Sequence, residues 1–364
     1  MDKLFGEKNL FENSARTVNS GRFKIILPDV FGFCGGVIGA LKKLDNIINL
    51  NDDKKIYLLG EIIHNPTVNQ YFISSGVSII SESNIDDIFN IADQDDYIII
   101  PAFGIPLLLE RAIRKKYRNV IDTTCKNVKS VWNFISSEAK NKSTIILYGK
   151  PGHQEVQASI SRAENSSCII ILPGLKAAEY FSAFLNDNDL ASLKTRIGSI
   201  SVHKEIQCYN SQLINPDRFA MANQTTMLYS ETLKAEKIIR ETIEKKGSKL
   251  IACDTICRAT YLRQKAARKI CHQKPDLIFV VGGYESSNTL HLYKLAQKYS
   301  PVYYIKAADS IDNLSIKYFI PEELREAKVP TKQILKDISV IAIFAGASCP
   351  FTVINEIIEK FKGI

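Results

Sequence analysis

Three of the eight cysteines in this chain occupy the same kind of position, and their side chains carry the most specific chemistry in the sequence. Cys34, Cys125 and Cys257 each follow an apolar, β-branched run and open a segment with helical periodicity. A cysteine at a helix N-terminus lies near backbone N–H groups and the positive end of the helix dipole, which favour the thiolate. Three thiolates that converge could bind three irons of an iron–sulfur cluster and leave the fourth iron for another ligand.

Two of these cysteines are preceded by nearly the same residues, Asp122-Thr-Thr-Cys125 and Asp254-Thr-Ile-Cys257. A strand, a short turn and a helix N-terminus, used three times, predict an internal triplication of an α/β unit. The alternative is that each cysteine is a small buried hydrophobe, as free cysteines commonly are. Burial does not explain why polar neighbours repeat together with the cysteine, so the repetition favours the cluster.

The remaining five cysteines fit the ordinary role of a buried side chain. Cys168 lies within an apolar run, and three others have no partner at metal-ligand spacing: Cys208, Cys271 and Cys349. Cys253 is a rival ligand because it precedes Cys257 by four residues, but we expect it to end a strand and point into the sheet.

The composition excludes several classes of protein. An apolar share of 45% and a charged share of 24% over 364 residues indicate a soluble globular protein with room for two or three domains. The net charge of +8 comes from basic residues interleaved with acids, as in residues 234–246, which indicates solvated helix faces and not a nucleic-acid site. No apolar run predicts a membrane span or a signal peptide. Cysteines without paired spacing then favour a reducing, cytoplasmic location.

Apolar strands alternate with helical segments from Phe23 onward, which predicts an α/β fold with parallel strands. The repeated units begin near Phe23, Asn119 and Leu250. The predicted division is a flexible extension 1–22, a first domain 23–118 joined by the C-terminal segment 346–364, a second domain 119–249, and a third domain 250–345. The polar stretch 182–219 interrupts the second domain and is predicted to be an insertion.

Four turns that follow apolar strands carry polar side chains. His64 lies in the first, His153 and Glu155 share the second, residues 286–289 form the third, and Ser348 ends the fourth. Helix N-termini with Ser and Asn are good seats for phosphate, and His153 with Glu155 could transfer a proton. Taken singly, each also fits an ordinary cap or turn. Their repetition at strand ends predicts one shared site.

Eight motifs resemble, in their order along the chain, those of the 4-hydroxy-3-methylbut-2-enyl diphosphate reductase family, known as LytB/IspH. The motifs are Phe33-Cys34-Gly35-Gly36-Val37, Glu61-Ile-Ile-His64-Asn65, Asp122-Thr-Thr-Cys125, Gly152-His153-Gln-Glu155-Val156, Gln224-Thr225-Thr226, Asp254-Thr-Ile-Cys257-x-Ala-Thr260, Ser286-Ser287-Asn288-Thr289 and Ala345-Gly-Ala-Ser348-x-Pro350. The resemblance runs from Phe23 to the C-terminus and includes all three cysteines.

The resemblance implies a trefoil of three pseudo-repeated α/β domains, with mainly parallel sheets, around a central [4Fe-4S] cluster. Cys34, Cys125 and Cys257 would be the cluster ligands, and one iron would not be bound by cysteine. The implied catalytic residues are Glu155, which would supply a proton, His153, and Thr225, which would orient the substrate hydroxyl. The residues implied to bind substrate are His64, His153, Thr225, Ser286, Ser287, Asn288 and Ser348.

The implied reaction is the two-electron reductive dehydroxylation of 4-hydroxy-3-methylbut-2-enyl diphosphate to isopentenyl and dimethylallyl diphosphates. It is the last step of the methylerythritol phosphate pathway of isoprenoid biosynthesis. The open iron would act as a Lewis acid on the hydroxyl oxygen. The implied partner is a low-potential electron donor, ferredoxin or flavodoxin.

The chain departs from the family pattern at three positions. Phe103 stands where the family places a His before Gly, and Phe cannot donate a hydrogen bond to a diphosphate. Such a bond to a charged group contributes about 1.5–3 kcal/mol. Lys126 follows Cys125 where the family usually has Pro, and Gln154 replaces the Pro of a His-Pro-Glu turn.

Two other functions stay open on the sequence alone. One is a paralogous enzyme that uses the same cluster on another small hydroxylated substrate, which Phe103 favours; a quinolinate synthase-like enzyme is a variant that the Ser-Ser-Asn-Thr and Gln-Thr-Thr motifs disfavour. The other is a non-catalytic cluster sensor. Intact Glu155 and Thr225 argue against a sensor, because a sensor needs no proton donor.

Overall fold

A computed structural model describes residues 16–50, 52–187, 192, 196, 200 and 205–364 of the chain. These residues form two compact units. Unit 1 contains the described residues of 1–51, Glu61–Ile79 and Arg258–Ile364, and unit 2 contains Asp52–Gly60 and Ile80–Cys257. The chain therefore passes from unit 2 into unit 1 directly after one of the three predicted ligand cysteines.

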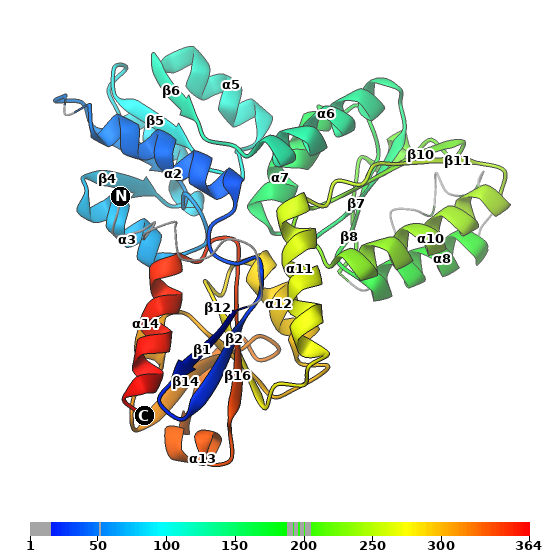
Figure 1. The fold of residues 1–364 in the computed structure, drawn as a ribbon. Coiled ribbons are helices and arrows are strands. Elements are labelled where there is room, and N and C mark those ends of the chain that lie inside the picture. The colour runs from blue at the N-terminus through cyan, green and yellow to red at the C-terminus, as the bar shows by residue number, and fades with distance from the viewer. Residues whose placement is uncertain (1–15, 51, 188–191, 193–195, 197–199, 201–204) are drawn as a thin grey trace. The chain divides into compact units, whose positions relative to one another are not determined.

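Unit 1 is built on a seven-stranded mixed sheet (Figure 1). The strand order is β1 (Arg16–Ser20), β2 (Phe23–Leu27), β16 (Val340–Ala345), β12 (Leu277–Val281), β13 (Val302–Ile305), β14 (Ser315–Ile320) and β15 (Arg325–Pro330). The four strands from β2 to β13 in this order are parallel, and β1, β14 and β15 add antiparallel pairings at the two edges. β12 and β16 are nearly continuous apolar runs, as parallel strands with both faces covered usually are.

Helices cover both faces of this sheet. α14 (Phe351–Lys362) lies on one face and packs Ile357 and Phe361 against Phe23 and Phe279. Its apolar residues recur every three or four positions, so they form a single stripe that faces the sheet. α11 (Arg258–Cys271) and α12 (Ser287–Ala296) lie side by side on the other face (Figure 1). The unit also contains α2 (Gly35–Ile48), α3 (Pro66–Ser74) and α13 (Thr331–Leu335).

Unit 2 contains two sheets. In the first, β3 (Ile56–Leu59), β5 (Tyr97–Ile100) and β6 (Asn119–Asp122) are parallel and adjacent in that order. β4 (Val77–Ile80) falls on the division between the two units. The second sheet has the order β11 (Lys249–Ala252), β10 (Arg218–Asn223), β7 (Thr144–Tyr148), β8 (Ile169–Leu172) and β9 (Gln207–Tyr209). Its strands are parallel except for β9, which pairs antiparallel with β8.

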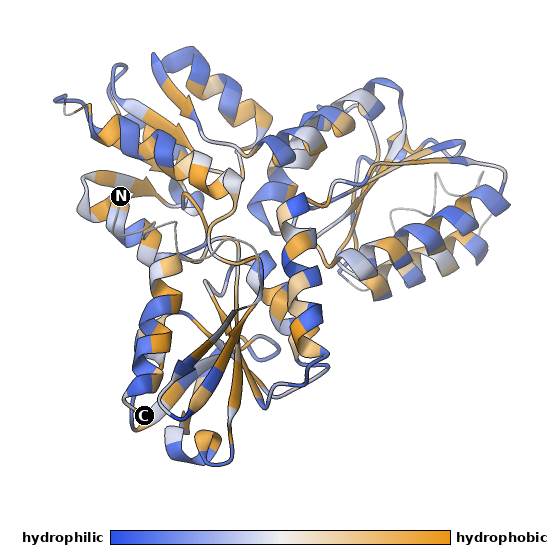
Figure 2. Cartoon of the chain, viewed as in Figure 1, coloured by the Kyte–Doolittle hydropathy of each residue, from blue (hydrophilic) through white to orange (hydrophobic). Residues whose placement is uncertain are grey.

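The five-stranded sheet of unit 2 is buried because helices cover each face. Tyr148 and Ile170 face α8 (Leu175–Asp187) and α10 (Tyr229–Lys245), which lie side by side (Figure 1). The alternate residues, such as Ile145 and Ile171, face α6 (Lys126–Lys140) and α7 (Gln154–Ile160). Figure 2 shows α10 with both hydrophobic and hydrophilic residues, as expected for a helix that packs on a sheet with one side. α4 (Ile88–Ile91) and α5 (Leu107–Lys116) pack on the other sheet.

The predicted α/β class with mainly parallel sheets is confirmed, but β6 and β11, the strands before Cys125 and Cys257, are edge strands and the last strands of their sheets along the chain. β2 pairs with β16, β6 with β5, and β11 with β10. The predicted boundaries near Asn119 and Leu250 therefore separate β6 and β11 from the strands with which they pair. The segment 346–364, predicted to join a domain 23–118, contains α14, which packs on Phe23 of that domain and also on Phe279 of the predicted third domain. The helices after Cys125 and Cys257, α6 and α11, pack instead with elements that follow them along the chain.

Two predicted segments differ from expectation in part. Of the extension 1–22, residues 1–15 lie outside the described residues, whereas Arg16–Ser20 form β1 at the edge of the unit 1 sheet. Of the insertion 182–219, the first residues continue α8, and β9 and the start of β10 lie near its end. Most residues between them lie outside the described part of the chain. Among the described helices, none has the length and apolar character needed to cross a membrane.

Candidate functional site

The three predicted ligand cysteines are held by the same backbone contact. The N–H groups of Cys34, Cys125 and Cys257 donate to the carbonyls of Ala347, Ala102 and Thr225, at 3.2, 3.0 and 3.0 Å. Each acceptor is the second residue after the end of the neighbouring parallel strand, which is β16, β5 or β10. The contact places each cysteine at the carboxyl edge of its sheet, where α/β proteins bind ligands. Cys34 belongs to unit 1, and Cys125 and Cys257 belong to unit 2.

The turns before Cys125 and Cys257 share two further hydrogen bonds. In each, the first residue is an Asp whose Oδ1 accepts the N–H two positions on, and the second is a Thr whose Oγ1 donates to a carbonyl of the adjacent strand. The bonds are Thr124 to Asp122 (2.8 Å) and Ile256 to Asp254 (3.1 Å), then Thr123 to Ile100 and Thr255 to Asn223 (2.6 Å each). The repeated sequence therefore makes a repeated structure.

The other cysteines are poorer ligand candidates. Burial raises the pKa of Cys271 and Cys349 to about 12 and also raises the pKa of Cys253, so these groups stay protonated thiols. Cys168 is buried in the core as predicted, and its Sγ lies 3.8 Å from that of Cys208. Within the described residues, no group of three or more His, Cys, Asp or Glu side chains is arranged to hold one metal ion.

Unit 2 brings together the predicted proton donor and its predicted partner. Glu155 is 2% exposed, and its carboxylate accepts both the N–H of Thr225 (2.6 Å) and the Thr225 hydroxyl (3.0 Å). Burial raises the pKa of Glu155 to about 7, against the two hydrogen bonds from Thr225, which lower it. The carbonyl of the same Thr225 accepts the N–H of Cys257. Thr225 therefore hydrogen-bonds both to the buried carboxyl of Glu155 and to Cys257, a predicted ligand cysteine.

His153 caps the helix that carries Glu155. Its Nδ1 accepts the N–H of Glu155 at 3.1 Å, so a neutral His153 carries its proton on Nε2 and can donate from that side. The ring of Phe103 meets the His153 ring edge-on, with 5.8 Å between centroids and an angle of 89°. Phe103 therefore contacts the predicted catalytic histidine but brings no hydrogen-bonding group.

Unit 1 brings together most of the predicted diphosphate ligands. Ser348 Oγ lies 3.4 Å from Ser286 Oγ and 3.3 Å from the carbonyl of His64. Asn288 Oδ1 accepts the N–H of Ala347 at 3.0 Å, and that residue's carbonyl holds Cys34. Ser287, the first residue of α12, is 3% exposed. These side chains gather at the carboxyl edge of the unit 1 sheet beside one predicted ligand cysteine.

Close backbone approach is part of this arrangement. A side chain at Gly283 would overlap the carbonyl of His64, and one at Gly346 would overlap the hydroxyl of Thr289. The glycines thus let the strand ends and the α12 N-terminus meet without intervening side chains. The imidazole of His64 is oriented by Glu61, whose carboxylate lies 3.2 Å from Nδ1.

Two polar residues that lie in the sequence motifs, but were given no role there, support these ligands. Asn65 is 3% exposed, and its Nδ2 donates to the carbonyl of Ser348 at 2.8 Å. Thr260 is 1% exposed, and its hydroxyl accepts from Asn288 Nδ2 at 3.1 Å. The Asn65-Pro66 pair is a recognisable helix start, because Asn65 caps α3. Thr260 ends the motif that begins at Asp254, but its contact with Asn288 follows only from the structure.

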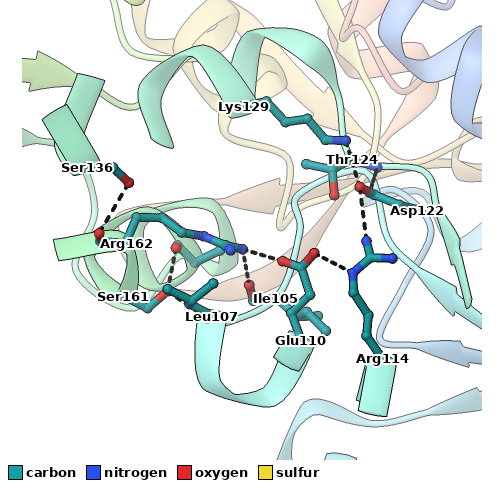
Figure 3. Close-up of polar contacts among 11 residues, drawn as sticks. Ile105, Leu107, Glu110, Arg114, Asp122, Thr124, Lys129, Ser136, Ser161 and Arg162 are labelled. Atoms are coloured by element: carbon teal, nitrogen blue, oxygen red, sulfur yellow. Dashed lines mark hydrogen bonds and ion pairs between the residues drawn. The ribbon is translucent and has the colours of Figure 1, made fainter. Parts of the chain in front are cut away.

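A polar network fixes the turn before Cys125 (Figure 3). Asp122 Oδ2 binds Lys129 Nζ at 2.6 Å and lies 3.6 Å from Arg114, which also binds Glu110. Glu110 in turn pairs at 2.9 Å with Arg162, whose side chain is 7% exposed. Arg162 donates to the carbonyl of Ile105 and lies over the ring of the single tryptophan, Trp132, at 3.7 Å from its centroid.

The family model described as "LytB protein" matches residues 25–362 of the chain. The chain belongs to the LytB family. It is 32% identical, over 97% of its own length and 88% of theirs, to proteins named 4-hydroxy-3-methylbut-2-enyl diphosphate reductase from Prochlorococcus marinus subsp. pastoris and from Synechococcus sp.. This LytB chain therefore aligns with those relatives across both of its units.

Two solved structures share the fold of this LytB chain. The structure of the E-1-hydroxy-2-methyl-but-2-enyl-4-diphosphate reductase from Plasmodium falciparum matches with a TM-score of 0.69 at 23% identity, over 93% of this chain and 87% of that one. A structure of (E)-4-hydroxy-3-methyl-but-2-enyl diphosphate reductase matches with a TM-score of 0.56 at 24% identity, over 93% and 99%. These matches confirm the α/β fold.

Proposed function

We propose that this LytB protein is an iron–sulfur reductase that converts 4-hydroxy-3-methylbut-2-enyl diphosphate to isopentenyl and dimethylallyl diphosphates. The observation that carries this proposal is the link from Glu155 through Thr225 to Cys257. The reaction breaks an allylic C–O bond, adds two electrons and two protons, and releases water. It therefore needs a proton donor close to its source of electrons, which a cluster sensor does not.

The residues present fit an iron–sulfur cluster with Cys34, Cys125 and Cys257 as its ligands. All three are partly exposed at helix N-termini and are held by the same backbone contact. The turn before Cys125 also contains a buried hydroxyl, that of Thr124, with no hydrogen-bond partner among the described residues. A [4Fe-4S] cluster bound there would supply the electrons and a Lewis-acidic iron not bound by cysteine.

Glu155 would hold the proton that leaves with the substrate hydroxyl. With a pKa of about 7 the carboxyl is substantially protonated at neutral pH, so it can donate and later recover a proton. Thr225 holds both oxygens of this carboxyl and would place its own hydroxyl beside that of the substrate. His153 would donate from Nε2, because Nδ1 is occupied by the N–H of Glu155.

The polar cluster of unit 1 would bind the diphosphate. Its hydroxyl, amide and imidazole donors suit phosphate oxygens, and the N-terminus of α12 adds the positive end of a helix dipole. The residues proposed to bind substrate are His64, His153, Thr225, Ser286, Ser287, Asn288 and Ser348. The proposed electron donor is a ferredoxin or a flavodoxin, since the reaction consumes low-potential electrons.

A second candidate is the same chemistry on a different small hydroxylated substrate, and Phe103 is the observation that favours it. Its ring packs on His153 and offers no donor. Loss of one hydrogen bond to a charged group would weaken diphosphate binding by about 1.5–3 kcal/mol, or roughly ten- to a hundredfold. A substrate with fewer negative charges would lose less.

The test is an anaerobic assay of the reconstituted protein with 4-hydroxy-3-methylbut-2-enyl diphosphate and a reduced viologen dye. Dye oxidation with formation of both five-carbon diphosphates would support the proposed reaction. A protein with a full cluster that leaves this substrate unchanged would favour the second candidate. A protein that binds no iron under reconstitution would refute both.

A further inference from the structure

The turn Asp122–Cys125 leaves one buried polar group without a hydrogen bond. The N–H and hydroxyl of Thr123 both donate to the carbonyl of Ile100, the N–H of Thr124 donates to Asp122, and the N–H of Cys125 donates to Ala102. The hydroxyl of Thr124 remains. Thr124 is 7% exposed, and its Oγ1 has no hydrogen-bond partner within the described part of the chain. A buried hydroxyl with no partner destabilises the folded protein and therefore needs an explanation.

The matching turn before Cys257 serves as an internal comparison. It makes the same three kinds of hydrogen bond, yet the residue in the place of Thr124 is Ile256, which is 9% exposed. The turn geometry therefore does not require a hydroxyl at this position, and an apolar side chain fills it. The shape of the turn therefore does not explain the hydroxyl of Thr124.

The nearest rival acceptor within the protein is the Asp122 carboxylate. Burial opposes ionisation of Asp122, but Lys129 and both the hydroxyl and N–H of Thr124 lower its pKa. The Thr124 hydroxyl lies close enough to this carboxylate to lower its pKa as a hydrogen-bonding group, but the two do not reach hydrogen-bond geometry. The carboxylate is already bound by Lys129 and by the Thr124 N–H. Figure 3 shows Thr124 beside Asp122 and its partners Lys129 and Arg114. Asp122 therefore has charged and N–H partners that do not depend on the Thr124 hydroxyl.

We propose that the hydroxyl of Thr124 donates a hydrogen bond to a sulfur of the bound cluster, either Cys125 Sγ or a bridging sulfide. This inference rests on the proposed cluster. Reduction adds negative charge to a cluster, and a hydrogen bond to its sulfur stabilises the reduced form more than the oxidised form. Thr124 is therefore a positioning residue that raises the reduction potential on the Cys125 side. Ile256 cannot do the same on the Cys257 side, so the two turns are unequal.

Three variants of the reconstituted protein test the inference. Thr124→Val keeps the shape and removes the hydroxyl, Thr124→Ser keeps the hydroxyl, and Thr124→Ile copies the sister turn. The readout is the midpoint potential of the cluster, measured by anaerobic titration and followed by electron paramagnetic resonance. We expect Thr124→Val and Thr124→Ile to need about tenfold more reductant for half-reduction, which is a potential lower by about 59 mV for one electron. Thr124→Ser should stay close to the parent.

Each outcome decides the matter. An unchanged potential in Thr124→Val with a full cluster would overturn the inference and assign the hydroxyl to Asp122 alone. Loss of the cluster from both apolar variants, but not from Thr124→Ser, would replace tuning by cluster retention and would also overturn it. Failure of the parent protein to bind any cluster is a different result, because it refutes the proposed function as well.

Discussion

The hydroxyl of Thr225 sets the pH range over which Glu155 can donate a proton, and Thr225→Val tests this. The substitution keeps the side-chain shape and removes one of the two hydrogen bonds to the carboxylate, while the 2.6 Å bond from the Thr225 N–H remains. The lost bond favours the ionised carboxylate, so its removal raises the pKa of Glu155 above the present value of about 7.

The size of the shift follows from the strength of that bond. A hydrogen bond to a charged group contributes about 1.5–3 kcal/mol, and one pKa unit corresponds to about 1.4 kcal/mol. We therefore expect the pKa of Glu155 to rise by about one to two units. Because the protonated form is the donor, the decline of kcat at high pH should move upward by the same amount, even though kcat itself falls.

The assay is the pH dependence of kcat, with reduced viologen as electron donor, for the parent protein, Thr225→Val and Thr225→Ser. Thr225→Ser is the matched control, since it keeps the hydroxyl that donates to Glu155. Its profile should coincide with that of the parent. A high-pH limb that stays in place in Thr225→Val, or that moves to lower pH, would refute the assignment of that limb to Glu155.

Four further predictions follow from particular contacts. Glu155→Gln should abolish turnover with the cluster intact. In the parent protein, the raised pKa of Glu155 makes the folded state lose about 3 kcal/mol of stability as the pH rises from 4.5 through about 7. Glu155→Gln should not show this loss, which is measured as the difference in the free energy of unfolding between pH 4.5 and pH 8. Cys125→Ala should lose iron and the visible absorption of the cluster. Phe103→His should lower KM for the diphosphate roughly ten- to a hundredfold by restoring a donor. Glu110→Ala should destabilise the protein by about 3 kcal/mol in denaturant titrations, because it leaves the buried Arg162 cation unpaired.

Matched controls separate these effects from general damage. Glu241→Gln removes a carboxylate from the exposed surface of α10 and should show neither loss of turnover nor a pH-dependent gain in stability. Phe103→Leu keeps an apolar side chain and should not lower KM. Retained activity in Glu155→Gln would remove that residue from its proposed role, and an unchanged iron content in Cys125→Ala would contradict the proposed ligand set.

The sequence alone was sufficient for the element types and for placing the candidate site residues at strand ends. Continuous apolar runs such as those from Thr144 and Val340 became buried parallel strands, because a strand covered by helices on both faces must be apolar throughout. The repeated Asp-Thr-x-Cys sequences form the same hydrogen bond from an N–H to the Asp side chain, because that bond joins residues two positions apart. Features that depend on residues close together in the sequence can be predicted without a structure.

The tertiary structure alone decided which strands pair and which side chains meet. Glu155 and Thr225 are 70 positions apart, and their contact exists because β7 and β10 are adjacent in the five-stranded sheet. The same applies to β6, which joins the sheet of β5 although the sequence suggests that it opens a new unit. Periodicity reports how deeply a strand is buried but not which neighbour buries it, because pairing is selected by the packing of the whole chain. For the same reason, only the structure distinguishes the hydroxyl of Thr124 from those of Thr123 and Thr255, which are already bonded to neighbouring strands.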